Sequence, residues 1–377
     1  MDYRSILLFL FATLLPSGLI ALAGGCAMRK LAPRWGLVDK PGARKVHTTP
    51  TALGGGIAIW LGVLLPFAVG TFILFLFHYQ LVDPDWLPPL AREHFGGLWQ
   101  QLPRLWVLLG AATVLMLLGL ADDRYGLDWK IRIAVQLGIA LICITTQGWR
   151  LTAFIGIPAL TVGLSAIWIV ALVNSFNMLD NMDGLSGGVA AIAACMLAAV
   201  LLLAPDPQTH RPQLFVAGLL LVLVGAILGF LWHNRPPARI FMGDAGSYFI
   251  GFTIAVATLL ATYAGYHSAT RHAVLAPVCV LAVPLYDMTT VIWIRLREGR
   301  SPFVADKNHF SHRLVDLGFT KGQAVLTIYL TTATCGLGAL LLHRVDQVGA
   351  VLIILMIACV LSIIALIEST ARRKIKA

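Results

Sequence analysis

Charged residues are scarce in this 377-residue chain, at 12% of the sequence, and only 18 residues are Asp or Glu. So low a charge content excludes an ordinary soluble domain, in which about 25% of residues are charged. None of the six cysteines forms a CxxC pair, so we expect neither a disulfide framework nor a zinc site. The chain also lacks GxxxxGK[ST] and GxGxxG loops, which excludes the common ATP-binding motifs.

Long apolar runs fill most of the sequence instead. Hydrophobic residues make up 58% of the chain, and its mean hydropathy is +0.83. Eleven apolar segments are each roughly 16 to 25 residues long, the length that a transmembrane helix needs. They begin near Ile6, Leu53, Leu105, Ile131, Ala159, Gly187, Gln213, Ser247, Ala273, Gln323 and Val348. We therefore predict an all-α polytopic membrane protein with about eleven transmembrane helices, which form one membrane-embedded domain over residues 1–377.

The Lys and Arg residues are unevenly divided between the two sides of this predicted bundle. Alternate connecting stretches, 28–52, 122–132, 174–186, 233–246, 295–322 and 372–377, hold 21 of the 28. Because positive residues concentrate on the cytoplasmic side, the N-terminus is predicted outside and the C-terminus inside. The net charge of +10 then reflects topology and contact with anionic membrane lipid, and no nucleic acid partner is expected.

Every dense polar cluster falls in these cytoplasmic stretches. There are five: "KPGARKVHTTPTALGGG" (40–56), "ADDRYGLDWK" (121–130), "NSFNMLDNMDGLSGG" (174–188), "HNRPPARIFMGDAGS" (233–247) and "DKNHFSHRL" (306–314). Acidic groups at a membrane are costly unless they are paired, hydrated or bound to a metal. We predict that the five stretches converge into one pocket at the inner membrane surface.

The second stretch places Asp122 and Asp123 side by side at the end of an apolar segment. Adjacent carboxylates repel one another, and a nearby cation relieves that repulsion. Lys130 adds a positive charge suited to phosphate on the same loop. A solvated helix end without a function remains the alternative interpretation of the pair.

The third stretch spaces Asn177, Asp180 and Asp183 three residues apart, so that they are neighbours on a helix. The pattern predicts a helix that ends or breaks near Gly184, and the two glycines at 187 and 188 allow other groups to approach closely. An ordinary Asp/Asn/Gly loop is the alternative.

The fourth stretch places Asp244 between two glycines, directly before an apolar segment. There, free backbone N–H groups at a helix start can hold phosphate while the acid holds a hard cation. Asn234 offers amide groups that suit the edge of a nucleobase.

In the fifth stretch His309 and His312, with Lys307 and Arg313, form a cationic loop. A zinc site needs further soft ligands, and none are near in sequence. Hydrogen bonding to phosphate is the simpler role, and two solvated histidines are the alternative. Together the clusters predict a magnesium-dependent phosphoryl-transfer site whose second substrate is lipid-borne, with a donor other than ATP.

In this order, the stretches resemble the polyprenyl-phosphate N-acetylhexosamine-1-phosphate transferase superfamily, a match that spans nearly the whole chain. The motifs that carry it are DD followed by Lys130, NxxNxxDxxDGL at 174–185, NxxPAxxFMGDxGS at 234–247 and HxxH at 309–312. The first and last stretches are similar to the branch that primes teichoic acids, lipopolysaccharide O-antigens and other envelope polysaccharides with N-acetylglucosamine 1-phosphate.

The resemblance implies that an oxygen of undecaprenyl phosphate attacks the sugar-linked phosphorus of a UDP-N-acetylhexosamine and releases UMP. It implies Mg²⁺ as cofactor, with Mn²⁺ as the alternative ion. It also implies a bacterial inner-membrane location, an active site on the cytoplasmic face, and a homodimer as in many relatives.

The resemblance also implies roles for single residues. Asp244 and Asp123 are expected to bind the metal. The expected catalytic residues are Asp122, Asp123, Asp180, Asp183 and His309. The expected substrate-binding residues are Lys45, His47, Lys130, Asn177, Asn234, Phe241, His312 and Arg313. Within these sets Lys130 and His309 would neutralise diphosphate charge, and the uridine pocket would be lined by Asn177, Asp183, Asn234 and Phe241.

Two alternatives remain open. Phospho-MurNAc-pentapeptide transferases of peptidoglycan synthesis usually show three consecutive histidines, which this chain lacks. Asn181 stands where many relatives have Gly, and Ser311 where many have His, which leaves the sugar undecided. A cation-coupled transporter also needs intramembrane acids, but only Asp287 lies far enough inside a predicted segment.

Overall fold

The computed structural model describes residues 3–39, 49–83, 86, 89–151, 154–204, 206, 209, 211–264, 270–304, 306 and 308–376. Its α-helices are α1 (Tyr3–Leu31), α2 (Gly55–His78), α3 (Pro89–Tyr125), α4 (Trp129–Gln147), α5 (Pro158–Leu179), α6 (Leu185–Leu203), α7 (Leu214–Asn234), α8 (Gly243–Leu260), α9 (Ala276–Val280), α10 (Ala282–Arg297), α11 (Phe310–Asp316), α12 (Lys321–Leu341) and α13 (Gln347–Lys376). The described residues also form the 3₁₀ helices η1 (Ala32–Trp35) and η3 (Arg271–Leu275) and the short strands β1 (Val38–Asp39), β2 (Thr51–Leu53) and β3 (Ile240–Phe241).

Local sequence signals set several helix ends. The side chain of Asp128 accepts a hydrogen bond from Lys130 N at 2.7 Å and caps the start of α4. Gly148 caps the end of this helix in the left-handed region, with φ +69°. A capping box formed by Thr320 and Gln323 begins α12.

The number of membrane spans agrees with the prediction. Among the described residues ten helices are long and apolar enough to cross a membrane, and α9 with α10 forms an eleventh span if this pair, bent by 64°, counts as one. The bend has a local cause, because Pro284 near the start of α10 has no N–H to donate back along the helix. The segment expected from Leu105 begins earlier, at Pro89. The chain is thus an all-α multi-pass membrane protein.

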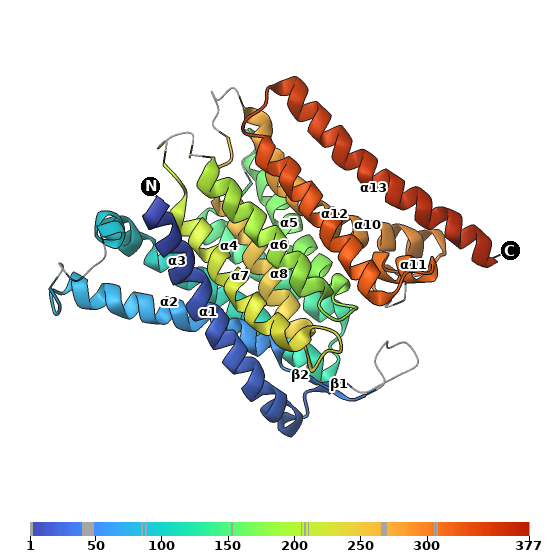
Figure 1. The fold of residues 1–377 in the computed structure, drawn as a ribbon, viewed down its shortest axis with the longest axis horizontal. Helices are drawn as coiled ribbons and strands as arrows, with labels where there is room; N and C mark the ends of the chain where they lie inside the picture. The colour runs from blue at the N-terminus through green and yellow to red at the C-terminus, as the bar shows by residue number, and fades with distance from the viewer. Residues whose placement is uncertain are drawn as a thin grey trace.

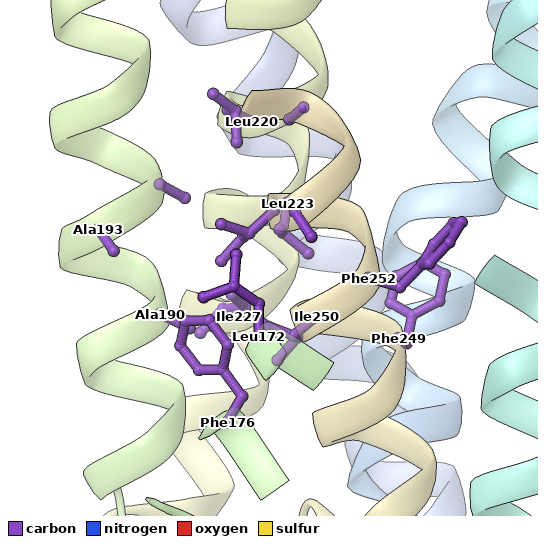
Figure 2. Packing of buried hydrophobic residues seen from close by; sticks show 14 of the residues in the cluster. Leu172, Phe176, Ala190, Ala193, Leu220, Leu223, Ile227, Phe249, Ile250 and Phe252 are labelled. Atoms are coloured by element: carbon purple, nitrogen blue, oxygen red, sulfur yellow. The ribbon is translucent and has the colours of Figure 1, made fainter. Parts of the chain in front are cut away.

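The core lies between α5, α6, α7 and α8. Figure 2 shows Leu172 and Phe176 of α5 meeting Ile227 of α7 and Ile250 of α8. From the opposite face of α8, Phe252 points toward α2 and α3. Outer helices leave large apolar side chains exposed, as a lipid environment requires, and α13 runs along the outside of the bundle beside α12 (Figure 1).

A small sheet joins distant parts of the chain at one end of the bundle. β1 pairs antiparallel with β2, and β2 pairs parallel with β3, with Ala52 opposite Ile240. In Figure 1 this sheet and α11 lie toward the end of the bundle that also holds the C-terminus. The parallel pairing fixes the chain directly before α8 and so positions Asp244.

Candidate active site

The candidate site is built around the first turn of α8, where α3 packs against it closely. Asp123, in the last turn of α3, accepts hydrogen bonds from the backbone N–H of Asp244 at 2.8 Å and of Ala245 at 3.2 Å. The approach depends on Gly119, since a Cβ there would lie 2.5 Å from Ala245 N. The N–H groups that we expected to be free for phosphate are therefore occupied, because a carboxylate also stabilises a helix N-terminus.

A side chain from α5 completes the contact with Asp244. Asn177 donates to the Asp244 Oδ1 atom at 2.6 Å and to Ser247 Oγ at 3.1 Å. Arg132 of α4 lies 3.7 Å from the other carboxylate oxygen of Asp244. Asp123, Asn177 and Asp244, which come from three of the five predicted stretches, thus meet at one point.

Asp122, which precedes Asp123 in the sequence, has a different set of partners. It is buried, and its Oδ2 atom accepts from Arg132 at 2.7 Å and from the Tyr248 hydroxyl at 3.2 Å. The backbone N–H of Leu127 donates to its Oδ1 atom at 2.7 Å. Arg132 is thus a cation beside Asp122, whereas no described ion pair joins it to Asp123. From the sequence, Arg132 was counted only as one of the Lys and Arg residues that set the topology. The one signal that could have identified it as a partner of Asp122 is its position at the start of the next apolar segment.

The predicted break between α5 and α6 is present. α5 ends at Leu179 with Asp180 as its C-cap, and Gly184 before α6 has φ +76°. Asp183 therefore lies in the turn and not on the helix. The predicted row of helical neighbours Asn177, Asp180 and Asp183 thus ends at Asp180, three residues earlier than expected. Its Oδ2 atom accepts from Ala238 N at 2.9 Å. The close approach predicted at the paired glycines also occurs, since a Cβ at position 188 would clash with the hydroxyl of Tyr329.

Asn234 joins this turn to β3. Its Oδ1 atom accepts from Gly184 N at 2.9 Å, and its Nδ2 atom donates to the Ile240 carbonyl at 2.9 Å. Because the side chain is buried, it orders the loop between the two segments. Phe241, the next residue in β3, is half-buried and lies opposite Leu53 of β2.

Several carboxylates lie close together in this region. Burial raises the pKa of Asp180 to about 7, and the carboxylates of Asp123 and Asp183 add to the rise, while a hydrogen bond from the Gly243 backbone opposes it. A cation near Asp180 would relieve this repulsion. In the described part of the chain, however, no three His, Cys, Asp or Glu side chains are grouped closely enough to form a ready metal site.

The residues predicted to bind phosphate lie in different parts of the chain, and the structure does not describe all of them. Lys130 is exposed, with its amine 5.8 Å from the ring centre of Trp129, and no described contact joins it to the acids. Lys45 and His47 lie outside the described residues.

α11 carries His309 at its N-cap, followed by His312 and Arg313. The two histidine rings are 6.3 Å apart. Ser311 donates to Asn181 Oδ1 at 2.5 Å, which ties α11 to the turn after α5. The two positions that depart from the pattern of many relatives therefore contact each other.

Comparisons with known proteins show which proteins this chain is similar to. The model of a family described as "Glycosyl transferase family 4" matches residues 105–262. The chain is 29% identical to the "Probable undecaprenyl-phosphate N-acetylglucosaminyl 1-phosphate transferase" of Bacillus subtilis, over 93% of this chain and 89% of that protein. It is 35% identical to the "Decaprenyl-phosphate N-acetylglucosaminephosphotransferase" of Mycobacterium tuberculosis, over 83% and 77%. It is 30% identical to the "Undecaprenyl-phosphate alpha-N-acetylglucosaminyl 1-phosphate transferase" of Escherichia coli, over 81% and 76%.

Proposed function

Because this chain belongs to glycosyl transferase family 4, we propose that it transfers N-acetylglucosamine 1-phosphate from UDP-N-acetylglucosamine to undecaprenyl phosphate and releases UMP. The relatives' names support this class of reaction, with a polyprenyl phosphate as acceptor. The observation that carries the proposal is the convergence of Asp123, Asn177 and Asp244 at the start of α8. We place the reaction at the cytoplasmic face of the bacterial inner membrane, where it would begin the synthesis of a cell-envelope polysaccharide.

The proposed reaction exchanges one phosphoanhydride for another. An oxygen of the lipid phosphate forms a bond to the sugar-linked phosphorus, the bond from that phosphorus to the bridging oxygen breaks, and UMP leaves with that oxygen. A general base is not required, because a phosphate monoester loses its second proton with a pKa of about 6. Asp122 and Asp123 therefore position the reactants, in keeping with the hydrogen bonds that already hold both carboxylates in place.

We propose that the acidic residues bind a magnesium ion together with the substrate phosphates, since the described side chains alone do not form a complete metal site. Mg²⁺ prefers carboxylate oxygens, and burial together with the nearby carboxylates of Asp123 and Asp183 raises the pKa of Asp180, a cost that a bound cation would offset. We propose that Asp244 and Asp123 hold the ion, with Asp180 beside them. Bound there, it would neutralise charge on the donor diphosphate.

The donor would lie between the turn after α5 and α11. Asn177, Asp183, Asn234 and Phe241 are proposed to shape the uridine pocket, directly or by ordering its loops. The donor diphosphate is proposed to meet the predicted phosphate-binding groups, which are Lys45, His47, Lys130, His309 and His312.

Purified protein incubated with labelled UDP-N-acetylglucosamine, undecaprenyl phosphate and Mg²⁺ should release UMP and form a lipid-linked sugar. Chelation should stop the reaction, and added Mg²⁺ or Mn²⁺ should restore it. The absence of UMP with every UDP-N-acetylhexosamine offered, UDP-MurNAc-pentapeptide included, would refute the enzymatic function. Solute flux in proteoliposomes would then favour transport.

A pair of matched variants tests the site itself. Asp244→Asn should remove several kcal/mol of transition-state stabilisation, which is a loss of more than about 100-fold in turnover. Asp316→Asn removes an exposed carboxylate at the end of α11 and should leave turnover unchanged. Equal activity in the two variants would remove Asp244 from the proposed metal site.

A further inference from the structure

The helix that carries the two histidines is too short to be stable alone. α11 spans seven residues, whereas isolated helices shorter than about 12 residues are marginal in water. Its position must therefore come from contacts with its neighbours. Phe310 and Leu314 are buried, the Ser311 hydroxyl donates to Asn181, and two buried carboxylates supply further polar contacts.

The first carboxylate is Asp287 of α10, which is completely buried. Its Oδ2 atom lies 3.0 Å from Nδ1 of His309, and its Oδ1 atom accepts from the backbone N–H of Phe310 at 2.5 Å. A carboxylate acceptor holds a proton on Nδ1 and leaves Nε2 to face a ligand, and a second proton on Nε2 would let it donate to a phosphate oxygen. One side chain thus fixes both the orientation of His309 and the start of its helix.

The second carboxylate is Glu368, which is buried although α13 is mostly exposed to lipid. Its Oε2 atom accepts from Arg313 Nε at 2.8 Å and from the Tyr286 hydroxyl at 3.1 Å. The rest of the Arg313 guanidinium donates to the Asn308 carbonyl at 2.5 Å and to Thr290 Oγ1 at 3.1 Å. Arg313 is buried too, so its guanidinium group contacts these protein groups and little solvent.

We propose that Asp287 and Glu368 are positioning residues, which hold α11 so that Nε2 of His309 faces the donor diphosphate. The inference rests on the proposed function for the identity of that ligand. Asp287 acts through His309, and Glu368 acts through Arg313. Arg313, which the sequence predicted to bind substrate, then serves as the link between α11 and the last helix.

Steady-state kinetics in a double-mutant cycle test the first pair. Asp287→Asn keeps the shape of the side chain but removes its charge, and it should lower kcat by about 10- to 100-fold, since misplacing a group by 1 Å can cost about 100-fold. In a His309→Gln background the same substitution should have almost no further effect, because the Asn oxygen can still accept from the Phe310 N–H and the contact with His309 is already absent. A full additional loss in that background, or no loss in the wild-type background, would refute the role of Asp287.

A chemical probe tests the same contact without any substrate. Diethyl pyrocarbonate modification, followed by mass spectrometry, compares His309 with His312 in one molecule. Asp287→Asn should increase the modification rate of His309 several-fold and leave that of His312 nearly unchanged. An unchanged ratio would contradict the inference. Because this measurement needs no turnover, its outcome is independent of whether UDP-N-acetylglucosamine is the donor.

The second pair is tested by comparing kcat with KM. Glu368→Gln should lower kcat and change the KM for the donor little, and it should add almost nothing in an Arg313→Met background. Glu298→Gln, which removes an exposed acid that pairs with Arg300 in the loop after α10, serves as the matched control. If Arg313 binds substrate directly, Arg313→Met will raise the donor KM strongly while Glu368→Gln does not, and the proposed role of Glu368 fails.

Discussion

Replacement of Gly119 by Ala tests whether the contact between α3 and α8 is needed for activity. The new Cβ would lie 2.5 Å from Ala245 N, whereas optimal contacts between heavy atoms are about 3.5 to 4.0 Å. Since backbone and not a flexible side chain stands in the way, the two helices must separate by about 1 Å. The hydrogen bond of 2.8 Å between Asp123 and the N–H of Asp244 would then exceed the usual limit of about 3.2 Å.

Two measurements follow from this separation. Overpacking of this kind typically costs about 1–3 kcal/mol, so the melting temperature in detergent should fall. Displacement of the acids by about 1 Å should lower UMP release on the order of 100-fold. Gly110→Ala is the matched control, because it lies in the same helix and its Cβ would meet nothing within 4 Å. Wild-type turnover by folded Gly119→Ala protein would show that the site does not depend on this contact.

Further predictions concern charge, topology and metal. Burial opposes ionisation of Asp306, but hydrogen bonds from Arg295 and Asn308 lower its pKa from 3.8 to about 2, so its ionised form stabilises the fold by about 2 kcal/mol above pH 4. Asp306→Asn should be less stable than wild type at pH 7 in thermal unfolding, and the difference should shrink as the pH falls toward 2; a constant difference would contradict this. A membrane-impermeant thiol reagent should label Trp86→Cys in intact cells but Tyr125→Cys only after the inner leaflet is exposed, and the reverse pattern would invert the predicted topology. Mg²⁺ should raise the melting temperature of wild-type protein but not that of Asp244→Asn; an equal rise in both would place the ion elsewhere.

The features that the sequence predicted well depend on local spacing. Asp180, Asp183 and Gly184 predicted the break between α5 and α6, since a glycine and short polar residues end a helix by local chemistry. The bulk apolar content of each segment likewise predicted the number of membrane spans. Both kinds of signal are contained within about 20 residues of chain.

The features that the sequence could not predict depend on contacts between distant segments. Asp123 binds the start of α8, which lies 121 residues further along the chain. Helices that are apolar on all sides give no periodic signal of which face meets which neighbour. The same difficulty hid Arg132 as the partner of Asp122. It also left Asp287 as the one acid placed deep enough to fit a transporter, whereas the structure shows its carboxylate 3.0 Å from Nδ1 of His309.

The parallel pairing of β2 with β3 has a consequence for biogenesis. Ala52 and Ile240 are 188 residues apart, which at about 5–20 residues per second means roughly 10 to 40 s of synthesis between the two strands. Until β3 has been made, β2 can pair only with β1. The chain directly before Asp244 therefore reaches its place in the sheet only after about two thirds of the protein has been synthesised, and a chain that stops earlier lacks this pairing.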